Sequence, residues 1–152
     1  MTLTRANVEA ILVQRTGPLL TAGGMDGATV NGANASLNDP IGYAIRKSGL
    51  AVSNIASVAD SDLTGVSSDD YDQLLDLAEY RTLENILGNL DDVNITVGSR
   101  TEALGQLSDQ VEKKMDRLAA RIEREYGVGL GTLQVGVINL GFQEQNSTTE
   151  AE

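Results

Sequence analysis

The chain has 152 residues and a net charge of −11, from 22 acidic and 11 basic residues. This length suits one domain, and so acidic a chain is a poor candidate for wrapping nucleic acid, because phosphates require cations. Cysteine and histidine are absent, which excludes disulfides, thiolate metal sites and the commonest general base. We therefore expect no enzyme, no cofactor and no bound metal.

The N-terminal part is predicted to be a helix followed by a long loop. The helix begins after Thr4, a typical N-cap, and ends at Thr16, because Gly17-Pro18 is a strong stop signal. Residues 22–38 are small, polar and rich in glycine, which favours a mobile surface loop. Neither a signal peptide nor a membrane-spanning run is present, so we expect a soluble protein made in a cytoplasm.

A short helix and a run of turns follow the loop. Asp39-Pro40 is typical of an N-cap followed by proline at the first helical position, and the helix is expected to run to about Ser48. The run DSDLTG at residues 60–65 resembles the start of a calcium-binding EF-hand loop, but Tyr71 stands where a bidentate glutamate is required. Helix caps separated by a turn are the favoured interpretation.

A long helix is predicted from Ser67 or Ser68 to about Leu90. Acidic residues fill its first turn, where they interact favourably with the helix dipole. A magnesium site at these acids is a weaker alternative. The apolar residues cover an arc wider than one face, which indicates contact with neighbours on two sides.

A second long helix is predicted from Ser99 to Gly127. Ser99 and Glu102 form a capping box, and apolar residues with spacings of three and four form one stripe. Basic residues lie along one flank of this stripe: Lys113, Lys114, Arg117, Arg121 and Arg124. Acidic residues lie along the other: Glu102, Asp109, Glu112, Asp116 and Glu123.

The basic flank has two main interpretations. It is either a solvated face with intrahelical ion pairs or a docking ridge for the acidic helix 67–92, in the same chain or in a neighbour. Nucleic-acid binding is a distant third. The hypothetical subunit interface comprises Lys113, Arg117, Arg121, Arg124, Asp72, Asp76 and Glu79.

The C-terminal segment, residues 128–142, is glycine-rich, apolar and uncharged. Its large residues mostly lie two apart, the period of an extended strand. It either packs as a hairpin on its own helices or serves as an arm that adds a strand to a partner's sheet or lies in a groove. The arm residues are Leu133, Val135, Val137, Ile138, Leu140 and Phe142. Residues 143–152 are polar and acidic, which is typical of a disordered tail.

The expected architecture is therefore mainly α: a small helical bundle over residues 1–127, with two long helices in its C-terminal half and an extended, β-prone arm. The helix pair DDYDQLLDLAEYRTLENILGNL and SRTEALGQLSDQVEKKMDRLAARIEREYG, followed by GTLQVGVINLGFQ, resembles in layout the head–tail connector (adaptor or neck) proteins of tailed bacteriophages.

This resemblance, over about residues 67–142, implies a structural virion protein. Such proteins form rings beneath the portal and join it to the tail, with terminal segments that lock neighbours together. The expected partners are other copies of the chain and the portal and tail proteins. DNA passes through the ring without being specifically bound, and no membrane is involved. The location implied is the virion neck, assembled in the host cytoplasm.

The main alternative is a cytoplasmic helical protein-binding or regulatory module that folds its tail onto itself. Light scattering distinguishes the two, because a monomer at all concentrations favours the alternative. A third hypothesis, a metal hydrolase built on carboxylates, predicts stabilisation by metal ions.

Overall fold

The computed structural model describes residues 2–96 and 101–130, with side chains described over 2–90 and 105–130. The described residues are mainly helical and include no β-strand, which confirms the helical fold class. Within this part of the chain, no helix combines the length and apolar character needed to cross a membrane. The elements in chain order are α1 (Arg5–Ala22), η1 (Ala35–Leu37), α2 (Asn38–Lys47), α3 (Asp60–Leu63), η2 (Ser68–Asp70), α4 (Tyr71–Thr96) and α5 (Thr101–Tyr126).

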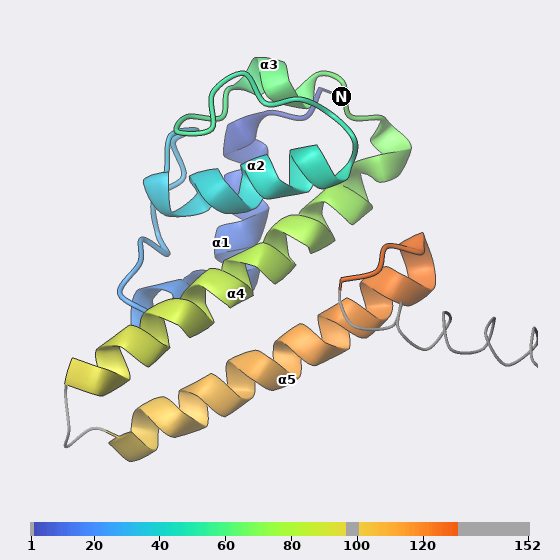
Figure 1. Cartoon of the computed structure of the whole chain (residues 1–152). Coiled ribbons are helices and arrows are strands. Elements are labelled where there is room, and N and C mark those ends of the chain that lie inside the picture. Colours follow the sequence, from blue (N-terminus) through green and yellow to red (C-terminus); the bar gives the residue numbers. More distant parts are fainter. Residues whose placement is uncertain (1, 97–100, 131–152) are drawn as a thin grey trace, which may run out of the picture.

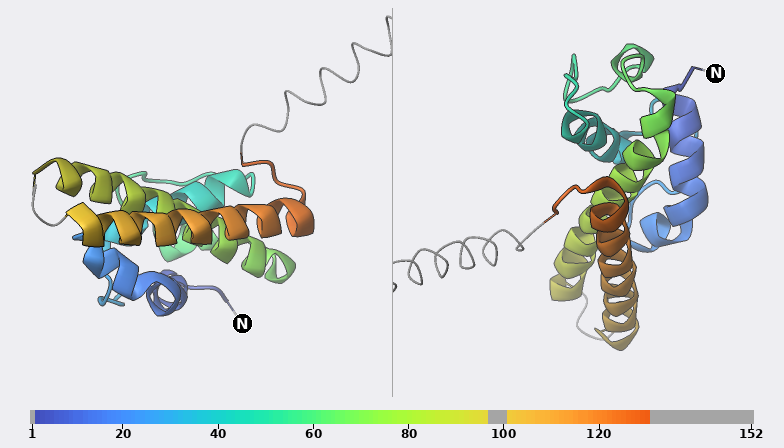
Figure 2. Two further views of the ribbon diagram at one scale, coloured as in Figure 1. Left: turned by 90° about the horizontal axis from the view of Figure 1, so that it is seen from below. Right: turned by 90° about the vertical axis from the view of Figure 1, so that its right-hand side faces the viewer.

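Helix α4 is the centre of the bundle and contacts α1, α2 and α5 (Figure 1). The prediction that this helix is covered on more than one side is thus confirmed. Helices α1 and α2 lie on opposite sides of α4, and α5 runs antiparallel to it (Figure 2). Leu74, Leu77, Leu83 and Ile86 of α4 are fully buried. Each such side chain contributes about 1.5–3 kcal/mol through removal from water.

The two long helices lie where the sequence predicts them, with differences at their ends. Ser67 caps a 3₁₀ turn that leads into α4, and α4 continues beyond the predicted end at Leu90 to Thr96. Helix α5 ends before Gly127, as expected. The capping box at Ser99 lies outside the described residues.

Helix α1 continues through Pro18 to Ala22, so the predicted end at Thr16 is wrong. Proline has no N–H to donate and normally disrupts a helix interior. Here the last turn is held by packing, because Leu20 is fully buried in the core. Gly24, with a φ of 75°, adopts the left-handed conformation that ends the helix.

The loop over residues 25–34 is tied to α1 through the carboxylate of Glu9. Glu9 is fully buried, and its Oε1 accepts a hydrogen bond of 3.0 Å from Nε of Arg5. Both carboxylate oxygens also accept backbone N–H groups of the loop at 2.7–3.2 Å, from Asn31, Gly32 and Asn34. The glycine-rich loop therefore has a definite attachment to the helix.

Arg5 completes this buried cluster. It is 3% exposed and donates from its guanidinium to the carbonyl oxygens of Asn34 and Val58 and to Oδ1 of Asn38. These bonds join α1 to the loop, to the start of α2 and to the segment before α3. We call Arg5 and Glu9, with these partners, the closed ion cluster.

Asp39 does not act as the N-cap of α2, contrary to the prediction. The preceding 3₁₀ turn carries the helix back to Asn38, which places Asp39 within the first turn. Its carboxylate instead accepts hydrogen bonds from Arg81 at 2.8 Å and from Asn85 at 2.9 Å, both on α4. The residue links two helices laterally.

The acids of the DSDLTG run cap helices, which confirms the favoured interpretation of that run. Oδ1 of Asp60 accepts the backbone N–H of Arg5 at 2.7 Å, at the start of α1. The carboxylate of Asp62 accepts the N–H groups of Ala59 at 2.9 Å and Ser53 at 3.0 Å. These two bonds lower the pKa of the Asp62 carboxyl.

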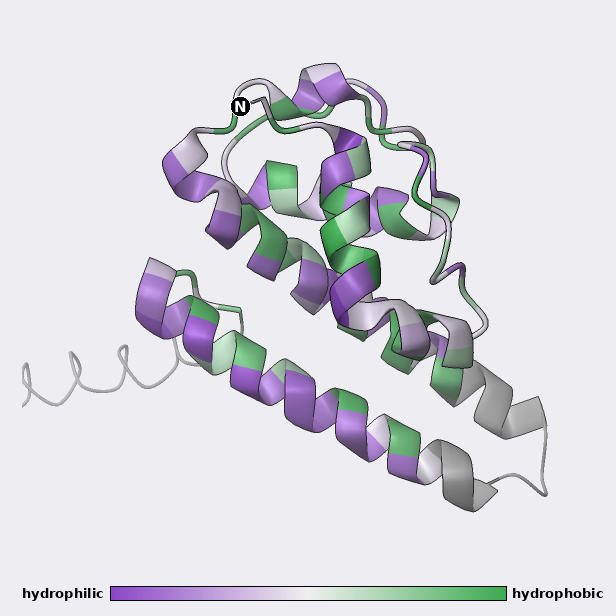
Figure 3. Ribbon diagram, turned by 180° about the vertical axis from the view of Figure 1, so that it is seen from behind, coloured by the Kyte–Doolittle hydropathy of each residue, from purple (hydrophilic) through white to green (hydrophobic). Residues whose placement is uncertain are grey.

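Helix α5 packs on α4 through the apolar stripe read from the sequence. Val111 and Ile122 are fully buried and Leu118 is 6% exposed. Figure 3 shows apolar residues recurring along α5 between hydrophilic ones. One face of α5 is therefore covered, while Arg117 and Arg124 of the basic flank stay exposed, as do Asp109, Glu112, Asp116 and Glu123 of the acidic flank.

Residues 127–130 follow α5 and lie on the α2 side of the bundle (Figure 2). Val128 and Leu130 are partly buried against the core and form no regular element. The rest of the predicted arm, including its β-prone character, and the acidic tail 143–152 lie outside the described residues.

Candidate functional site

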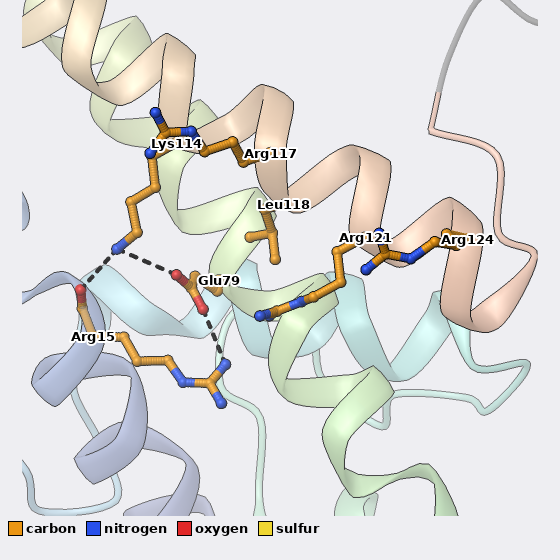
Figure 4. Close-up of a pocket in the computed structure, with 7 residues that line it drawn as sticks. All are labelled: Arg15, Glu79, Lys114, Arg117, Leu118, Arg121 and Arg124. Carbon is orange, nitrogen blue, oxygen red and sulfur yellow. Dashed lines mark hydrogen bonds and ion pairs between the residues drawn. The ribbon is translucent and has the colours of Figure 1, made fainter.

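The surface of the bundle has two features of interest, and the first is a recess of about 550 Å³ where α1, α4 and α5 meet. It is bounded by side chains of all three helices (Figure 4). We call it the basic recess, because its lining holds five cations: the residues are Arg15, Glu79, Lys114, Arg117, Leu118, Arg121 and Arg124.

Glu79 joins the three helices at one end of the recess. The side chain is 7% exposed, and its Oε2 accepts a hydrogen bond of 2.9 Å from Nη1 of Arg15. Its Oε1 pairs with Nζ of Lys114 at 3.3 Å. Lys114 also donates to the carbonyl oxygen of Arg15 at 2.9 Å. These bonds attach α5 to both α4 and α1.

Asp76, one turn earlier on α4, forms the second junction. Its side chain is 5% exposed and accepts hydrogen bonds from Arg15 at 3.0 Å and from Nη2 of Arg121. Its Oδ2 accepts the hydroxyl of Tyr126 at 3.0 Å. Burial, followed by the bond to this carboxylate, raises the pKa of Tyr126 to about 12.

The electrostatic state of the recess is cationic. Although burial opposes it, the bonds to Glu79 and Asp76 raise the pKa of Arg15, which holds its guanidinium in the charged form. Five cations surround two carboxylates, so positive charge is in excess by three in a chain whose net charge is −11. We call this set the open ion cluster.

Several donors of the open ion cluster are not used by its carboxylates. Arg117 makes no ion pair with any described residue, and Arg124 has only a 3.4 Å contact with its exposed neighbour Glu125. Nε of Arg121 is buried without a hydrogen-bond partner among the described atoms. An unsatisfied buried donor costs about 1–3 kcal/mol.

The second feature, an apolar groove of about 440 Å³, lies between the N-terminal parts of α1 and α4. Its apolar lining comes from Leu3, Ala10, Ile11, Tyr71 and Leu75. Of the lining residues that the structure describes, Asp72 is the one that carries a charge. Apolar surface of this kind is suited to an uncharged, apolar occupant.

The structure separates the residues of the hypothetical subunit interface into three groups. Asp76 and Glu79 are buried beneath α5, and Arg121 pairs with Asp76 inside the same chain. Arg117 and Arg124 are exposed at the basic recess. Lys113 is exposed on α5 and Asp72 lies at the apolar groove.

Docking of the basic ridge on the acidic helix thus takes place within one chain for Lys114 and Arg121. The arm residues lie outside the described part.

Three important residues were not identified from the sequence. Arg15 and Tyr126 belong to the open ion cluster, and Glu9 belongs to the closed one. The four-residue spacing of Arg5 and Glu9 was a usable signal, because such pairs share a helix face. The spacing of Tyr126 places it on the apolar stripe of α5 and does not indicate a bond of its hydroxyl to α4, and nothing local indicates that Arg15 reaches α4.

No grouping of three acidic side chains suited to a metal ion occurs within the described residues. Comparison with protein-family models, with curated proteins and with solved structures found no match.

Proposed function

We propose that this chain is a structural protein that forms a ring and acts as a head–tail connector in a tailed-phage virion. In this proposal the C-terminal segment of one copy binds in the apolar groove of the next. The ring joins the portal to the tail and surrounds a channel through which DNA passes.

One observation supports this proposal: the C-terminal segment leaves the bundle on a different side from the apolar groove. The described chain ends at Leu130 on the α2 side of the bundle, whereas the groove is formed by α1 and α4 (Figure 2). The segment that follows is uncharged and apolar up to Phe142, which suits the groove. A segment that leaves on one side and binds a groove on the other side of the next copy, without reciprocal exchange, makes a heterologous contact, and heterologous contacts generate rings when they close.

The acidity of the chain is compatible with a channel role. A negative wall repels phosphates, so DNA moves past without binding. Electron microscopy of the assembled protein tests this part: rings with an axial channel are expected. Compact particles without a channel would contradict the connector role, as would a gene neighbourhood without portal or tail genes.

The contact itself is tested by mixing two variants that are each defective on one side. A chain truncated after Leu130 keeps the groove and lacks the segment. Ala10→Glu keeps the segment and places a charge at an exposed position in the groove. Each alone should sediment as a monomer, and the mixture should give a one-to-one dimer.

Ala120→Glu is the matched control, because Ala120 is an exposed alanine on α5 away from the groove. This variant should assemble like the unmodified chain. Absence of a dimer in the mixture, or equal loss of assembly in the control, would contradict the contact.

One observation favours the alternative, a monomeric binding or regulatory module with its tail on its own domain. Val128 and Leu130 already pack against the core of their own chain. If the full chain remains monomeric at all concentrations, and removal of residues 131–152 lowers its stability, the tail folds in cis and the connector proposal fails.

A further inference from the structure

The basic recess is not explained by the proposed ring contact, which uses the groove and the C-terminal segment. Its cations exceed what the neighbouring carboxylates require. Asp76 and Glu79 are satisfied by Arg15, Lys114 and Arg121 together with Tyr126. Arg117 and Arg124 add two further guanidinium groups with no carboxylate partner on α1 or α4 within the described residues.

The geometry concentrates these unused donors around one space. Arg117, Arg121 and Arg124 come from successive turns of α5 and line the same recess (Figure 4). Nε of Arg121 is buried without a partner, while Nη2 of the same guanidinium is fixed by Asp76. Asp76 thereby fixes the orientation of the Arg121 guanidinium, whose positive charge lines the recess.

We propose that the basic recess binds a small multivalent oxyanion of the phosphate class, such as inorganic phosphate or pyrophosphate. Arg117 and Arg124 supply charge and donors from the exposed side, and the Arg121 guanidinium, held by Asp76, adds positive charge at the base. The volume of about 550 Å³ suits a small ligand.

The surroundings of the recess favour a free anion over a nucleotide or nucleic acid. Among the described residues of the lining, Leu118 is the one apolar residue, and none is an aromatic side chain on which a base would stack. The net charge of −11 repels a long polyanion, whereas a small anion interacts mainly with the local cations. Phosphate and pyrophosphate therefore fit better than a DNA backbone.

Isothermal titration of the full chain with pyrophosphate at low ionic strength tests this proposal. We expect saturable binding, weakened roughly tenfold or more in the double variant Arg117→Gln/Arg124→Gln, because each guanidinium–phosphate contact is charge-assisted. Arg46→Gln/Lys47→Gln is the control: it removes two exposed cations at the end of α2 and should bind like the unmodified chain.

Arg121→Lys examines the base of the recess. Lysine preserves the positive charge beside Asp76 but lacks the planar guanidinium of arginine. Weaker pyrophosphate binding at unchanged thermal stability supports a contribution of the Arg121 guanidinium to the site. Unchanged binding would remove Arg121 from the site.

Three outcomes would overturn the proposal. The first is absence of saturable binding, and the second is equal weakening in the control pair, which would indicate only general charge attraction. The third is tighter binding of a duplex oligonucleotide than of pyrophosphate, abolished by Arg117→Gln/Arg124→Gln, which would assign the recess to nucleic-acid phosphates. None of these results bears on the ring, because assembly is measured separately with Ala10→Glu and the truncated chain.

Discussion

The closed and the open ion clusters both pair basic side chains with buried carboxylates, but they differ in how far the basic side chains are exposed. In the closed cluster, Arg5 and Glu9 are 3% and 0% exposed, and both oxygens of Glu9 accept hydrogen bonds from neighbouring donors. In the open cluster, the carboxylates of Asp76 and Glu79 are buried, while the side chains of Arg15, Lys114 and Arg121 are 34–42% exposed.

The difference shows that the burial of an ion cluster decides whether it stabilises the fold or is available to bind a ligand. A cluster that is sealed and fully bonded has nothing to offer a ligand, so its contribution is to the unfolding free energy and to the choice of one loop conformation. A cluster with surplus donors at the surface contributes less to stability and is available to bind. Four perturbations, in order of decreasing expected effect, examine this division.

Glu9→Gln should be the most destabilising change. Both carboxylate oxygens accept hydrogen bonds, so the amide NH₂ of glutamine faces a donor in either orientation, and Arg5 loses its buried counter-charge. Removing one partner of a buried pair costs about 3–5 kcal/mol. Urea denaturation measures the loss, with the exposed Glu123→Gln as a control expected to lie within about 0.5 kcal/mol of the unmodified chain. If Glu9→Gln leaves the free energy of unfolding unchanged, the closed ion cluster is not isolated from water.

Asp76→Asn should have a smaller effect of about 1–3 kcal/mol, because water partly compensates its exposed cationic partners. Asp72→Asn, one turn away and exposed, is the matched control. The same denaturation experiment compares the two. If Asp76→Asn costs as much as Glu9→Gln, the distinction between open and closed clusters fails.

Tyr126 should make the stability of the chain depend on pH in the alkaline range. Its folded-state pKa of about 12 lies above the ordinary value of 10, so the folded chain holds the phenol proton more tightly. The resulting stability is fully present below pH 10 and is lost as pH rises through about 12. Tyr126→Phe should reduce the fall in unfolding free energy across this window. Titration of phenolate absorbance provides an independent check, and identical pH profiles for the two proteins would contradict the assignment.

Arg81→Gln should have the least effect. Arg81 pairs with Asp39 and Glu84 at the surface, at 2.8 and 3.2 Å, and all three side chains are about a third or more exposed. Exposed pairs of this kind contribute about 0.2–1 kcal/mol, and less at high salt. Melting temperatures of the variant and the unmodified chain at low and high salt measure this contribution. A larger, salt-independent loss would indicate that packing on Tyr43 matters more than charge.

The helices could be predicted because their signals are local. The apolar stripe of α5 and its stop at Gly127 are properties of one segment, as is the wide apolar arc of α4. The end of α1 was not predictable in this way. Pro18 is a local stop signal, and only the burial of Leu20 in the assembled core overrides it.

The ion clusters lay mostly beyond sequence reasoning for the same reason. Arg15 meets Asp76 and Glu79 across 61 and 64 residues of chain, and no spacing rule connects positions so far apart. The charge sorting on α5 did indicate a docking ridge, and Lys114 and Arg121 do dock on α4. What remained hidden was that Arg117 and Arg124 on the same flank face a recess.

The attachment of α5 has a mechanical consequence. The helix is held mainly along its contact with α4, and the bond of Tyr126 to Asp76 lies near its C-terminal end. A pulling force on the C-terminal segment would therefore reach the contacts of Val128 and Leu130 first and this bond next, and would then separate α5 from α4 starting at its C-terminal end. The closed cluster carries none of that load, because it joins α1, α2 and the loop. In a ring linked through its C-terminal segments, such a force would separate α5 first, while the contacts that join α1, α2 and the loop would stay intact.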